Sequence, residues 1–456
     1  MSGNPARIPL YQKREAIHPR AVSGRFQRLR DITVWLTMGA YILLPWVSWD
    51  GRQAVLFDLP ARQFHVFGIT FWPQDFILLS WLLILLAFML FVATVFAGRV
   101  YCGYVCPQTT WTRFFTWIEH FTEGDRHARQ RLDKAPWSRR KLLRRGSKHL
   151  LWWALASLTG ITFVGYFTPI DSLVWRAFVW DLGQWEIIWI AFFTAITYLN
   201  AGWLREQVCI YMCPYARFQS AMFDRNTLIV SYDEARGEPR ERGKRRRDEQ
   251  AGDCIDCDLC VQVCPTGIDI RNGLQYECIT CAACIDACDN VMDQIHKPRG
   301  LIRYTTENAL EGQPVQLLRP RLLGYTALLA VMALLLAWSL ATRVPLGIDV
   351  IRDRGQLYRT ASDGFIENSY QLRVMNRSQQ ARTVLIGLQA PEGLQWRHGE
   401  QQLVLEPGAS RILPVTLGYD PYQHRVNTGA IRFTLEDDDH ARYHRARESR
   451  FIAPRD

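Results

Sequence analysis

Long apolar stretches alternate with strongly polar segments along this chain of 456 residues. Five stretches contain no charged side chain and are long enough to cross the roughly 30 Å hydrocarbon core of a bilayer as helices. They are residues 32–49, 76–98, 150–170, 187–204 and 322–342. Tryptophans such as Trp49 and Trp203 lie near their ends, where an aromatic belt is expected. Buried core helices of a soluble protein rarely include five such runs, so we predict a five-helix transmembrane region.

The basic side chains predict the orientation of these helices. Segment 1–31 contains seven Lys or Arg, segment 99–149 contains twelve, and segment 205–321 contains sixteen. Loop 50–75 contains only two, and loop 171–186 contains one. The positive-inside rule places the three basic segments in the cytoplasm, and five spans then place the C-terminus outside. The polar N-terminal segment lacks an apolar run with a small-residue cleavage site, so we expect the first span to be a retained anchor.

The external tail, residues 343–456, contains short runs in which apolar and polar residues alternate. These runs are residues 370–375, 383–388, 402–405 and 430–435. Turn signals such as Pro391-Glu-Gly393 and Pro407-Gly408 separate them. Strands at this spacing predict a β-sandwich of about 100 residues. The tail has no Cys and no catalytic cluster, so we expect it to pack or to dock a partner.

Composition narrows the chemistry. The chain has 12 Cys, all between positions 102 and 288. Disulfide frameworks spread through secreted domains, so this concentration favours metal ligation in a reducing compartment. The formal net charge of +10 comes mostly from Lys and Arg beside the apolar spans, which indicates topology rather than nucleic-acid binding. The run Lys244-Arg-Arg-Arg247 suits the anionic lipid of the bilayer.

Eight of the cysteines form two runs with the same spacing in segment 205–321. Both runs read C-x2-C-x2-C-x3-C, the spacing of bacterial ferredoxins with two [4Fe–4S] clusters. They are Cys254-Ile-Asp-Cys257-Asp-Leu-Cys260-Val-Gln-Val-Cys264 and Cys278-Ile-Thr-Cys281-Ala-Ala-Cys284-Ile-Asp-Ala-Cys288. Zinc needs only four ligands in looser pairs, and it leaves this repetition unexplained. We therefore predict a ferredoxin-like α+β insert at about residues 245–300.

In such ferredoxins the fourth cysteine of each run ligates the other cluster. The predicted ligands are Cys254, Cys257, Cys260 and Cys288 for the first cluster, and Cys278, Cys281, Cys284 and Cys264 for the second. Two neighbouring clusters indicate an electron relay. Asp258 and Thr280 stand where such loops often carry glycine, which affects the amide hydrogen bonds to a cluster.

The remaining four cysteines form a repeat. Cys102-Gly-Tyr-Val-Cys106-Pro107 follows the second span, and Cys209-Ile-Tyr-Met-Cys213-Pro214 follows the fourth. Proline at a first helical position places Cys106 and Cys213 at helix N-termini, which with nearby Arg lowers a thiol pKa. If the repeats pack together, four thiols converge on a site for a soft metal. Copper, a third cluster and a redox disulfide remain open, and so does a simple helix-ending turn with buried cysteines.

Other polar side chains are weaker candidates. A group in loop 99–149 is expected to be a solvated face beside the lipid headgroups. Its members are Glu119, His120, Glu123, Asp125 and His127. In the first external loop, His65 and Asp50 could contact a metal, although single residues of this kind usually belong to the surface.

The segments that flank the cysteines resemble one family closely. They are Tyr101-Cys-Gly-Tyr-Val-Cys-Pro-Gln108, Glu123-Gly-Asp125 before Leu132-Asp133, Val230-Ser-Tyr-Asp-Glu-Ala-Arg-Gly237, Cys264-Pro-Thr-Gly-Ile-Asp-Ile270, Gly273-Leu-Gln-Tyr-Glu-Cys278 and Pro298-Arg-Gly-Leu-Ile-Arg-Tyr304. Generic ferredoxins do not share these flanks. Over nearly its whole length the chain resembles the cytochrome c oxidase accessory proteins of the CcoG/FixG/RdxA type.

The resemblance implies a multi-pass protein of the Gram-negative inner membrane whose external domain is periplasmic and immunoglobulin-like. It also implies a role in assembling cbb3-type cytochrome c oxidase, in which Cu(II) is reduced to Cu(I) for the haem–copper centre. The partners would be oxidase subunits or copper-delivery proteins, together with a cytoplasmic electron donor. Neither copper nor the oxidase follows from cysteine spacing alone, and the sequence is compatible with one protomer or a homodimer.

Three functions fit these observations. The leading one is a copper-reducing assembly factor, an oxidoreductase with copper near Cys102, Cys106, Cys209 and Cys213. The second is a quinol-linked membrane ferredoxin subunit that serves an external redox partner. The third is a scaffold without redox activity that docks oxidase subunits through the sandwich. Copper turnover or quinol oxidation would separate the first two, and rescue of assembly by a cluster-free variant would indicate the third.

Overall fold

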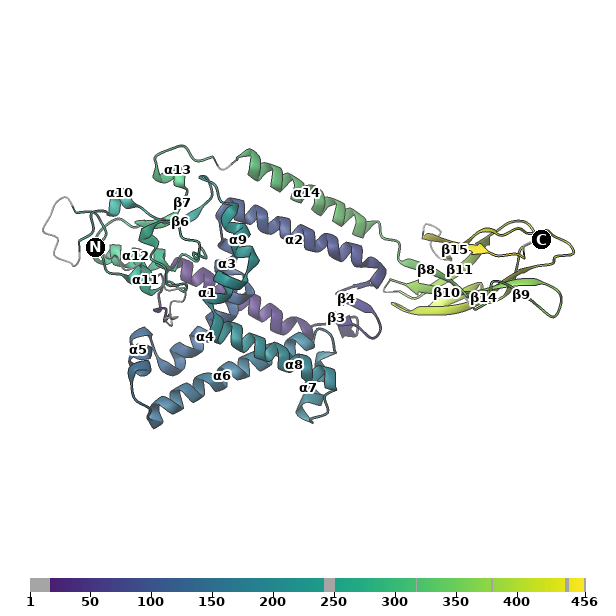
Figure 1. Ribbon diagram of the computed structural model, residues 1–456, viewed down its shortest axis with the longest axis horizontal. Helices are drawn as coiled ribbons and strands as arrows, with labels where there is room; N and C mark the ends of the chain where they lie inside the picture. Colours follow the sequence, from purple (N-terminus) through teal and green to yellow (C-terminus); the bar gives the residue numbers. More distant parts are fainter. Residues whose placement is uncertain are drawn as a thin grey trace, which may run out of the picture. The chain divides into compact units, whose positions relative to one another are not determined.

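The chain forms two compact units in a computed structural model (Figure 1). The described residues are 17–241, 251–316, 318–353, 355–378, 380–438 and 443–454. One unit comprises residues 1–45 and 83–332, and the other comprises residues 46–82 and 333–456. The basic run at 244–247 lies outside the described residues, and so do the first parts of the predicted segments 1–31 and 245–300.

Three helices follow the apolar stretches that predict them. Helix α2 spans Phe76–Ala97, and α14 spans Pro320–Ala341. Helix α8 spans Gln184–Thr197 and continues as a π-helical segment, Tyr198–Leu204. Within the described residues, these three are long and apolar enough to cross a membrane. The part of the chain that carries them therefore has the composition of a membrane protein.

The other two predicted spans lie on helices that begin with charged residues. Helix α1 spans Arg25–Leu43, and α6 spans Arg139–Val164. The prediction for residues 32–49 is wrong at its outer end, because Ser48–Trp49 forms strand β1. Each helix holds fewer consecutive apolar residues than the ~20 that a span needs. The count of five spans and their orientation therefore stay predictions.

Helix α6 packs closely against α8 and against α4, which spans Pro107–Glu123 (Figure 1). A Cβ atom on Gly160 of α6 would lie 2.7 Å from the carbonyl oxygen of Ile190 in α8. Only glycine permits this approach, as in other tightly packed helix pairs. Trp152 Nε1 in α6 donates a hydrogen bond of 3.1 Å to the carbonyl oxygen of Phe115 in α4.

The loop 99–149 is helical rather than extended. It contains α3 (Val100–Tyr104), α4 and α5 (Arg126–Lys134). The prediction of a solvated face is wrong for Glu119 and Glu123, which are both 4% exposed. Glu119 pairs with Arg129 at 2.7 Å and with Arg205 at 2.5 Å. These carboxylates are buried because α5 and the chain after α8 fold over them.

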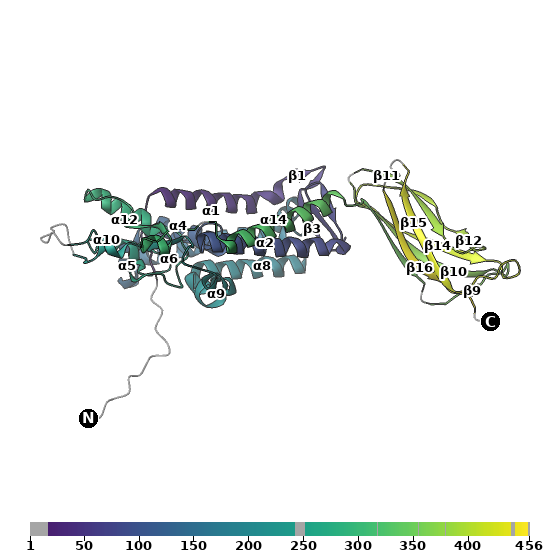
Figure 2. The same cartoon turned by 90° about the horizontal axis from the view of Figure 1, so that it is seen from above.

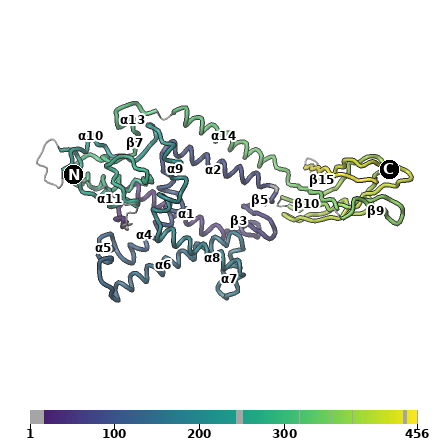
Figure 3. The backbone as a smooth tube through the Cα atoms, in the orientation of Figure 1, coloured from purple at the N-terminus to yellow at the C-terminus, as the bar shows by residue number. Residues whose placement is uncertain are grey.

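The insert between α9 (Pro214–Ala221) and α14 is built around a two-stranded antiparallel sheet (Figure 3). Strand β6 (Ile229–Tyr232) pairs with β7 (Ile302–Thr305). Its short helices are α10 (Glu234–Gly237), α11 (Leu259–Gln262), α12 (Ala283–Gln294) and α13 (Glu307–Leu310). Ile285 and Met292 of α12 pack against β6 and β7 in a small core. The two cysteine runs lie in the loops and helices beside this sheet.

The C-terminal part of the second unit is a β-sandwich, as its alternating runs predict (Figure 2). One sheet has the order β12-β14-β10-β8 with β9 on β10, and the other has the order β13-β11-β15-β16. The strands are β8 Leu346–Arg352, β9 Arg359–Thr360, β10 Ile366–Asn376, β11 Arg382–Gln389, β12 Gln395–His398, β13 Gln402–Leu405, β14 Ser410–Tyr419, β15 Gly429–Asp437 and β16 His444–Phe451. Leu372, Leu417 and Phe433 lie in the shared core.

The first external loop of the predicted topology also forms strands. They are β2 Arg52–Gln53, β3 Val55–Asp58, β4 Gln63–Val66 and β5 Ile69–Phe71. His65 is buried, and its Nδ1 lies 3.0 Å from the hydroxyl of Thr70. Within the described residues, no three His, Cys, Asp or Glu side chains are placed to hold one metal ion. His65 and Asp50 therefore remain without a structural sign of metal binding.

Candidate functional site

Four cysteines of the insert line one small cavity. Cys254 and Cys257 lie in the loop before α11, Cys260 lies in α11, and Cys288 lies in α12. Apolar side chains of α12 and β7 close the cavity. We call these four residues the first cysteine set.

The other four cysteines of the insert line a neighbouring cavity. This second cysteine set consists of Cys264, Cys278, Cys281 and Cys284. Cys260 of the first set also reaches its wall, so the two cavities are adjacent. The chain thus brings together the same two groups of thiols that the crossing ligand pattern pairs.

The backbone around both cavities fits an iron–sulfur cluster. Asp256 and Asp258 have φ of 49° and 56°, and Thr280 and Ala282 have φ of 55° and 60° at the equivalent positions of the second run. Left-handed residues of this kind turn successive amides toward one concave surface, which is how proteins bind anions and Fe–S centres. The repetition in both loops indicates that the chain prepares two equivalent cradles.

Burial of the thiols also favours the binding of an iron–sulfur cluster. It raises the pKa of Cys260, Cys278 and Cys288 to about 12. A thiolate at these positions therefore needs a compensating positive charge. Iron supplies that charge, because metal binding displaces the thiol proton.

An arginine that the cysteine pattern does not reveal holds the first loop in place. Arg271 Nη1 donates to Asp256 at 2.7 Å, and Nη2 donates to Asp258 at 2.8 Å. Its third partner, Asp269, has a pKa lowered by its hydrogen bonds to Arg271. The Arg271 side chain is 7% exposed. Arg271 thus holds Asp256 and Asp258 in the left-handed region, and the charge-assisted hydrogen bonds offset the conformational cost. Asp258 is one of the two positions where such loops often carry glycine.

The C-x3-C-P motifs begin helices as predicted. Cys106 is the N-cap of α4, with Pro107 at its first position, and Cys213 is the N-cap of α9, with Pro214 at its first position. The expected lowering of the Cys106 pKa is wrong, because burial raises it more than the amides of Thr109 and Gln108 lower it. Burial also raises the pKa of Cys102 to about 11 and that of Cys209 to about 12.

The two motifs come together from different helices. Cys102 lies in α3, and Cys209 lies in a π-helical turn, Val208–Met212. The charges of Cys102, Cys106 and Cys213 all act on the pKa of Cys209, so the four thiols share one region. We call it the thiol site. Within the part of the chain that the structure describes, its sulfurs do not form a ready-made site for a single ion.

The thiol site lies directly against the second cysteine set. A Cβ atom on Gly103 would lie 2.7 Å from the carbonyl oxygen of Ile279. The buried Arg99, just before α3, donates 2.5 Å to the carbonyl oxygen of Tyr276. The Tyr276 hydroxyl donates 3.3 Å to the carbonyl oxygen of Ile210, inside the second motif. One close backbone contact and two hydrogen bonds from side chains to backbone therefore connect the regions of both C-x3-C-P motifs to the loop of the second set.

Comparison with protein families assigns the cysteine-bearing regions. Residues 204–307 match the 4Fe-4S dicluster domain, and residues 78–142 match the 4Fe-4S binding domain. Residues 336–454 match the IG-like fold at the C-terminus of FixG. The chain therefore carries iron–sulfur clusters and an immunoglobulin-like C-terminal domain.

Curated relatives cover most of the chain. Nitrogen fixation protein FixG of Rhizobium meliloti is 39% identical in an alignment of 428 residues, and the match covers 85% of this chain and 82% of the relative. Protein RdxB of Cereibacter sphaeroides is 44% identical in an alignment of 397 residues, and the match covers 83% of each chain. A crystal structure of a FixG-related protein from Vibrio parahaemolyticus, 36% identical, covers 24% of this chain and 95% of its own, with a TM-score of 0.22.

Proposed function

The chain belongs to the FixG/CcoG family of iron–sulfur proteins, and we propose that it reduces Cu(II) to Cu(I) for the assembly of a cbb3-type cytochrome c oxidase. The contact between Gly103 and the loop of the second cysteine set carries this proposal. Because of this contact, electrons on the insert have only a short distance to travel to the four thiols of the thiol site, which are soft metal ligands.

In this proposal the two cysteine sets each hold a [4Fe–4S] cluster, which supplies one-electron transfer when bound. The electron comes from a reductant on the cytoplasmic side. Cu(II) accepts one electron and becomes Cu(I), so the balance needs one electron for each ion.

The thiol site would hold the copper. Thiolate sulfur selects Cu(I) over harder cations, so the product is favoured there. Because the pKa of Cys102 and of Cys209 lies far above neutral pH, copper binding must displace protons from these thiols. The four sulfurs must also move closer together when copper binds, because the structure does not arrange them to coordinate a single metal ion.

The setting of the proposed reaction is the inner membrane. The N-terminus and the insert would face the cytoplasm, and the immunoglobulin-like domain would face the periplasm. That domain has its own core and lacks cysteine, which suits docking of oxidase subunits or copper-delivery proteins. The proposal does not need more than one protomer.

Copper turnover by the anaerobically purified protein tests the proposal. With excess dithionite removed after reduction, the wild-type chain should convert added Cu(II) to Cu(I), measured with a Cu(I)-selective chelator. The Cys209→Ala/Cys213→Ala variant should lose most of that activity and keep its iron content. Arg299→Gln, a change at an exposed side chain of the insert outside the cysteine runs, is the matched control. Full activity in the double variant with intact clusters would overturn the proposed copper site.

A further inference from the structure

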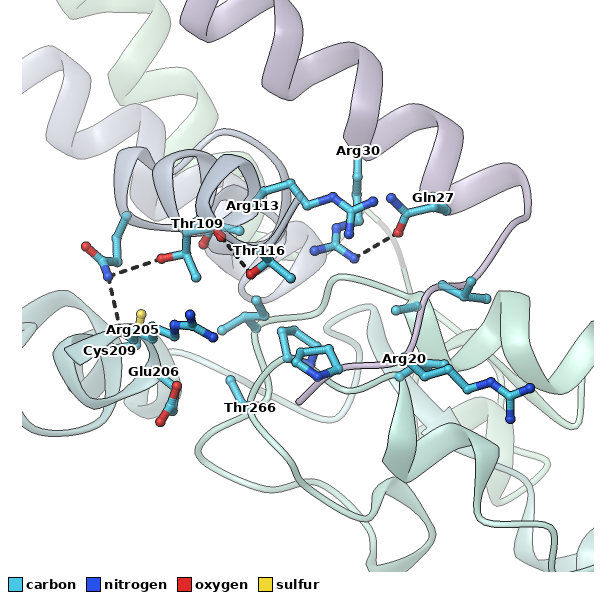
Figure 4. A pocket seen from close by; sticks show the side chains of 18 of the residues that line it. Arg20, Gln27, Arg30, Thr109, Arg113, Thr116, Arg205, Glu206, Cys209 and Thr266 are labelled. Carbon is cyan, nitrogen blue, oxygen red and sulfur yellow. Dashed lines mark hydrogen bonds between the residues drawn. The ribbon is translucent and has the colours of Figure 1, made fainter. Parts of the chain in front are cut away.

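A pocket lined by both charged and apolar side chains lies between the second cysteine set and the thiol site (Figure 4). Its walls come from the segment before α1, from α1 and α4, from the turn after α8 and from the cluster loops. Cys209 lines one wall. Ile279 and Ala283, which neighbour Cys278 and Cys284, line another. A ligand in this pocket would lie beside both redox regions.

The lining is rich in arginine. The charged residues on the described wall are Arg20, Arg30, Arg113, Arg205 and Glu206. Arg113 donates 3.0 Å to Asp31, and Arg205 donates 2.5 Å to Glu119, so both have a carboxylate partner. Arg20 and Arg30 form no ion pair with a residue that the structure describes.

Arg30 is the most informative of these residues. It is 6% exposed, and within the described chain its guanidinium donates only to the amide oxygen of Gln27, at 3.2 Å. A neutral amide does not compensate a buried positive charge, which is costly to leave without a counter-charge.

A second guanidinium extends toward the same space. Figure 4 shows Arg30 of α1 and Arg113 of α4 pointing toward one another. The pKa of Arg113 is lowered by burial and then by the charge of Arg30. Two like charges therefore lie close together, one of them on the buried Arg30, and this arrangement favours an anion between them.

Neutral polar groups complete the wall. Thr109, Thr112 and Thr116 follow α4 at helical spacing and line the pocket, while the hydroxyls of Thr109 and Thr116 donate to backbone carbonyl oxygens. The guanidinium forks suit a ligand rich in oxygen. Arg20 is exposed and Glu206 adds a carboxylate to the wall, so the charge that a bound anion would compensate is mainly that of the buried Arg30, with Arg113 beside it.

We propose that this pocket binds a phosphate group, with Arg30 and Arg113 as its charged partners. The group comes either from a free phosphate anion or from the headgroup of a phospholipid, and the chemistry of recognition is the same for both. This inference does not depend on the reduction of copper, and a protein that fails to turn over copper can still bind the phosphate.

The full-length protein with its clusters tests the inference in two arms. In the first, delipidated protein in detergent is dialysed against radiolabelled inorganic phosphate. In the second, phospholipid that remains with the purified protein is extracted and quantified as phosphorus. Each arm compares the wild-type chain with Arg30→Gln and with Arg28→Gln, an exposed arginine on the same helix that does not line the pocket.

Saturable phosphate binding that Arg30→Gln weakens about tenfold or more, and Arg28→Gln does not, would support a free anion. Bound phospholipid that is lost only in Arg30→Gln would support a headgroup. Absence of both ligands from the wild-type chain, or equal retention by Arg30→Gln, would overturn the inference. If Arg30→Gln loses its clusters, Arg113→Lys replaces it in both arms. Lysine keeps the positive charge but lacks the planar guanidinium group of arginine, and the same outcomes apply.

Discussion

Gly103 packs against the backbone of Cys281, so that a Cβ atom on Gly103 would lie 2.9 Å from the Cα atom of Cys281. Gly103 lies between two cysteines of the thiol site, and Cys281 belongs to the second cysteine set. Real Cβ atoms do not approach backbone atoms this closely, and both partners here are backbone. Any other residue at position 103 must therefore push the two redox regions apart.

Gly103→Ala should slow the transfer of electrons from the reduced insert to copper several-fold. The added methyl group separates α3 from the loop of the second set, and it also disturbs the amides around that cluster. Stopped-flow oxidation of the reduced clusters by Cu(II) measures the rate, and electron paramagnetic resonance (EPR) of the reduced protein measures the disturbance.

Gly146→Ala is the matched control for this change. Gly146 is also helical, in α6, but a Cβ atom there meets nothing within 4 Å. That variant should transfer electrons at the wild-type rate. A Gly103→Ala protein with normal kinetics and a normal spectrum would show that the contact does not control the path.

Arg271→Gln should weaken the first cluster more than the second. The change removes charge-assisted hydrogen bonds to Asp256 and Asp258, each worth about 1.5–3 kcal/mol, and frees two left-handed residues beside Cys257. Iron and sulfide content should fall toward half, and EPR should retain the signal of one cluster.

Arg299→Gln provides the comparison, because Arg299 pairs with Asp293 at an exposed site. Such pairs contribute little to stability. Equal loss of both clusters in Arg271→Gln would mean that Arg271 supports the insert as a whole and not the first loop.

Glu119→Gln should destabilise the helical region by about 3–5 kcal/mol. The variant leaves Arg129, whose side chain is 0% exposed, without the charge that compensates it. Thermal unfolding in detergent measures the effect, with Asp293→Asn as an exposed control. An unchanged unfolding temperature would show that water or lipid reaches Arg129.

The cysteine spacing predicts much of the site because local sequence dictates it. Each C-x2-C-x2-C-x3-C run places three thiols around one cavity and its fourth thiol at the neighbouring cavity, as the crossing pattern predicts. The support from Arg271 lies outside the runs and could not be predicted. Its only sequence signal is the presence of Asp256 and Asp258 where glycine is easier to accommodate.

Long-range burial accounts for most of the errors. Glu119 is predicted to be solvated, but its partner Arg205 lies 86 residues further along the chain. Cys106 is at a helix N-terminus as predicted, yet burial by other elements reverses the expected change in its pKa. Strand β16 is missed because its charged sequence at the sheet edge lacks an alternating apolar pattern.

Removal of the clusters should unfold the insert and leave the β-sandwich intact. The insert has only a two-stranded sheet and short helices, whereas the sandwich has two sheets and a large core. Metal-bound folds of this size often depend on their metal. After anaerobic iron chelation, hydrogen exchange should rise across residues 254–305 and stay slow across residues 366–435. Slow exchange in both regions would contradict the prediction.

A single turnover followed by rapid freezing and EPR tests the central claim most directly. When the fully reduced protein, which holds one electron on each of its two clusters, meets two equivalents of Cu(II), the Cu(II) signal and the reduced cluster signal should disappear together in the wild-type chain. Both signals should persist in Cys209→Ala/Cys213→Ala. Equal rates of loss in the two proteins would contradict transfer through the thiol site.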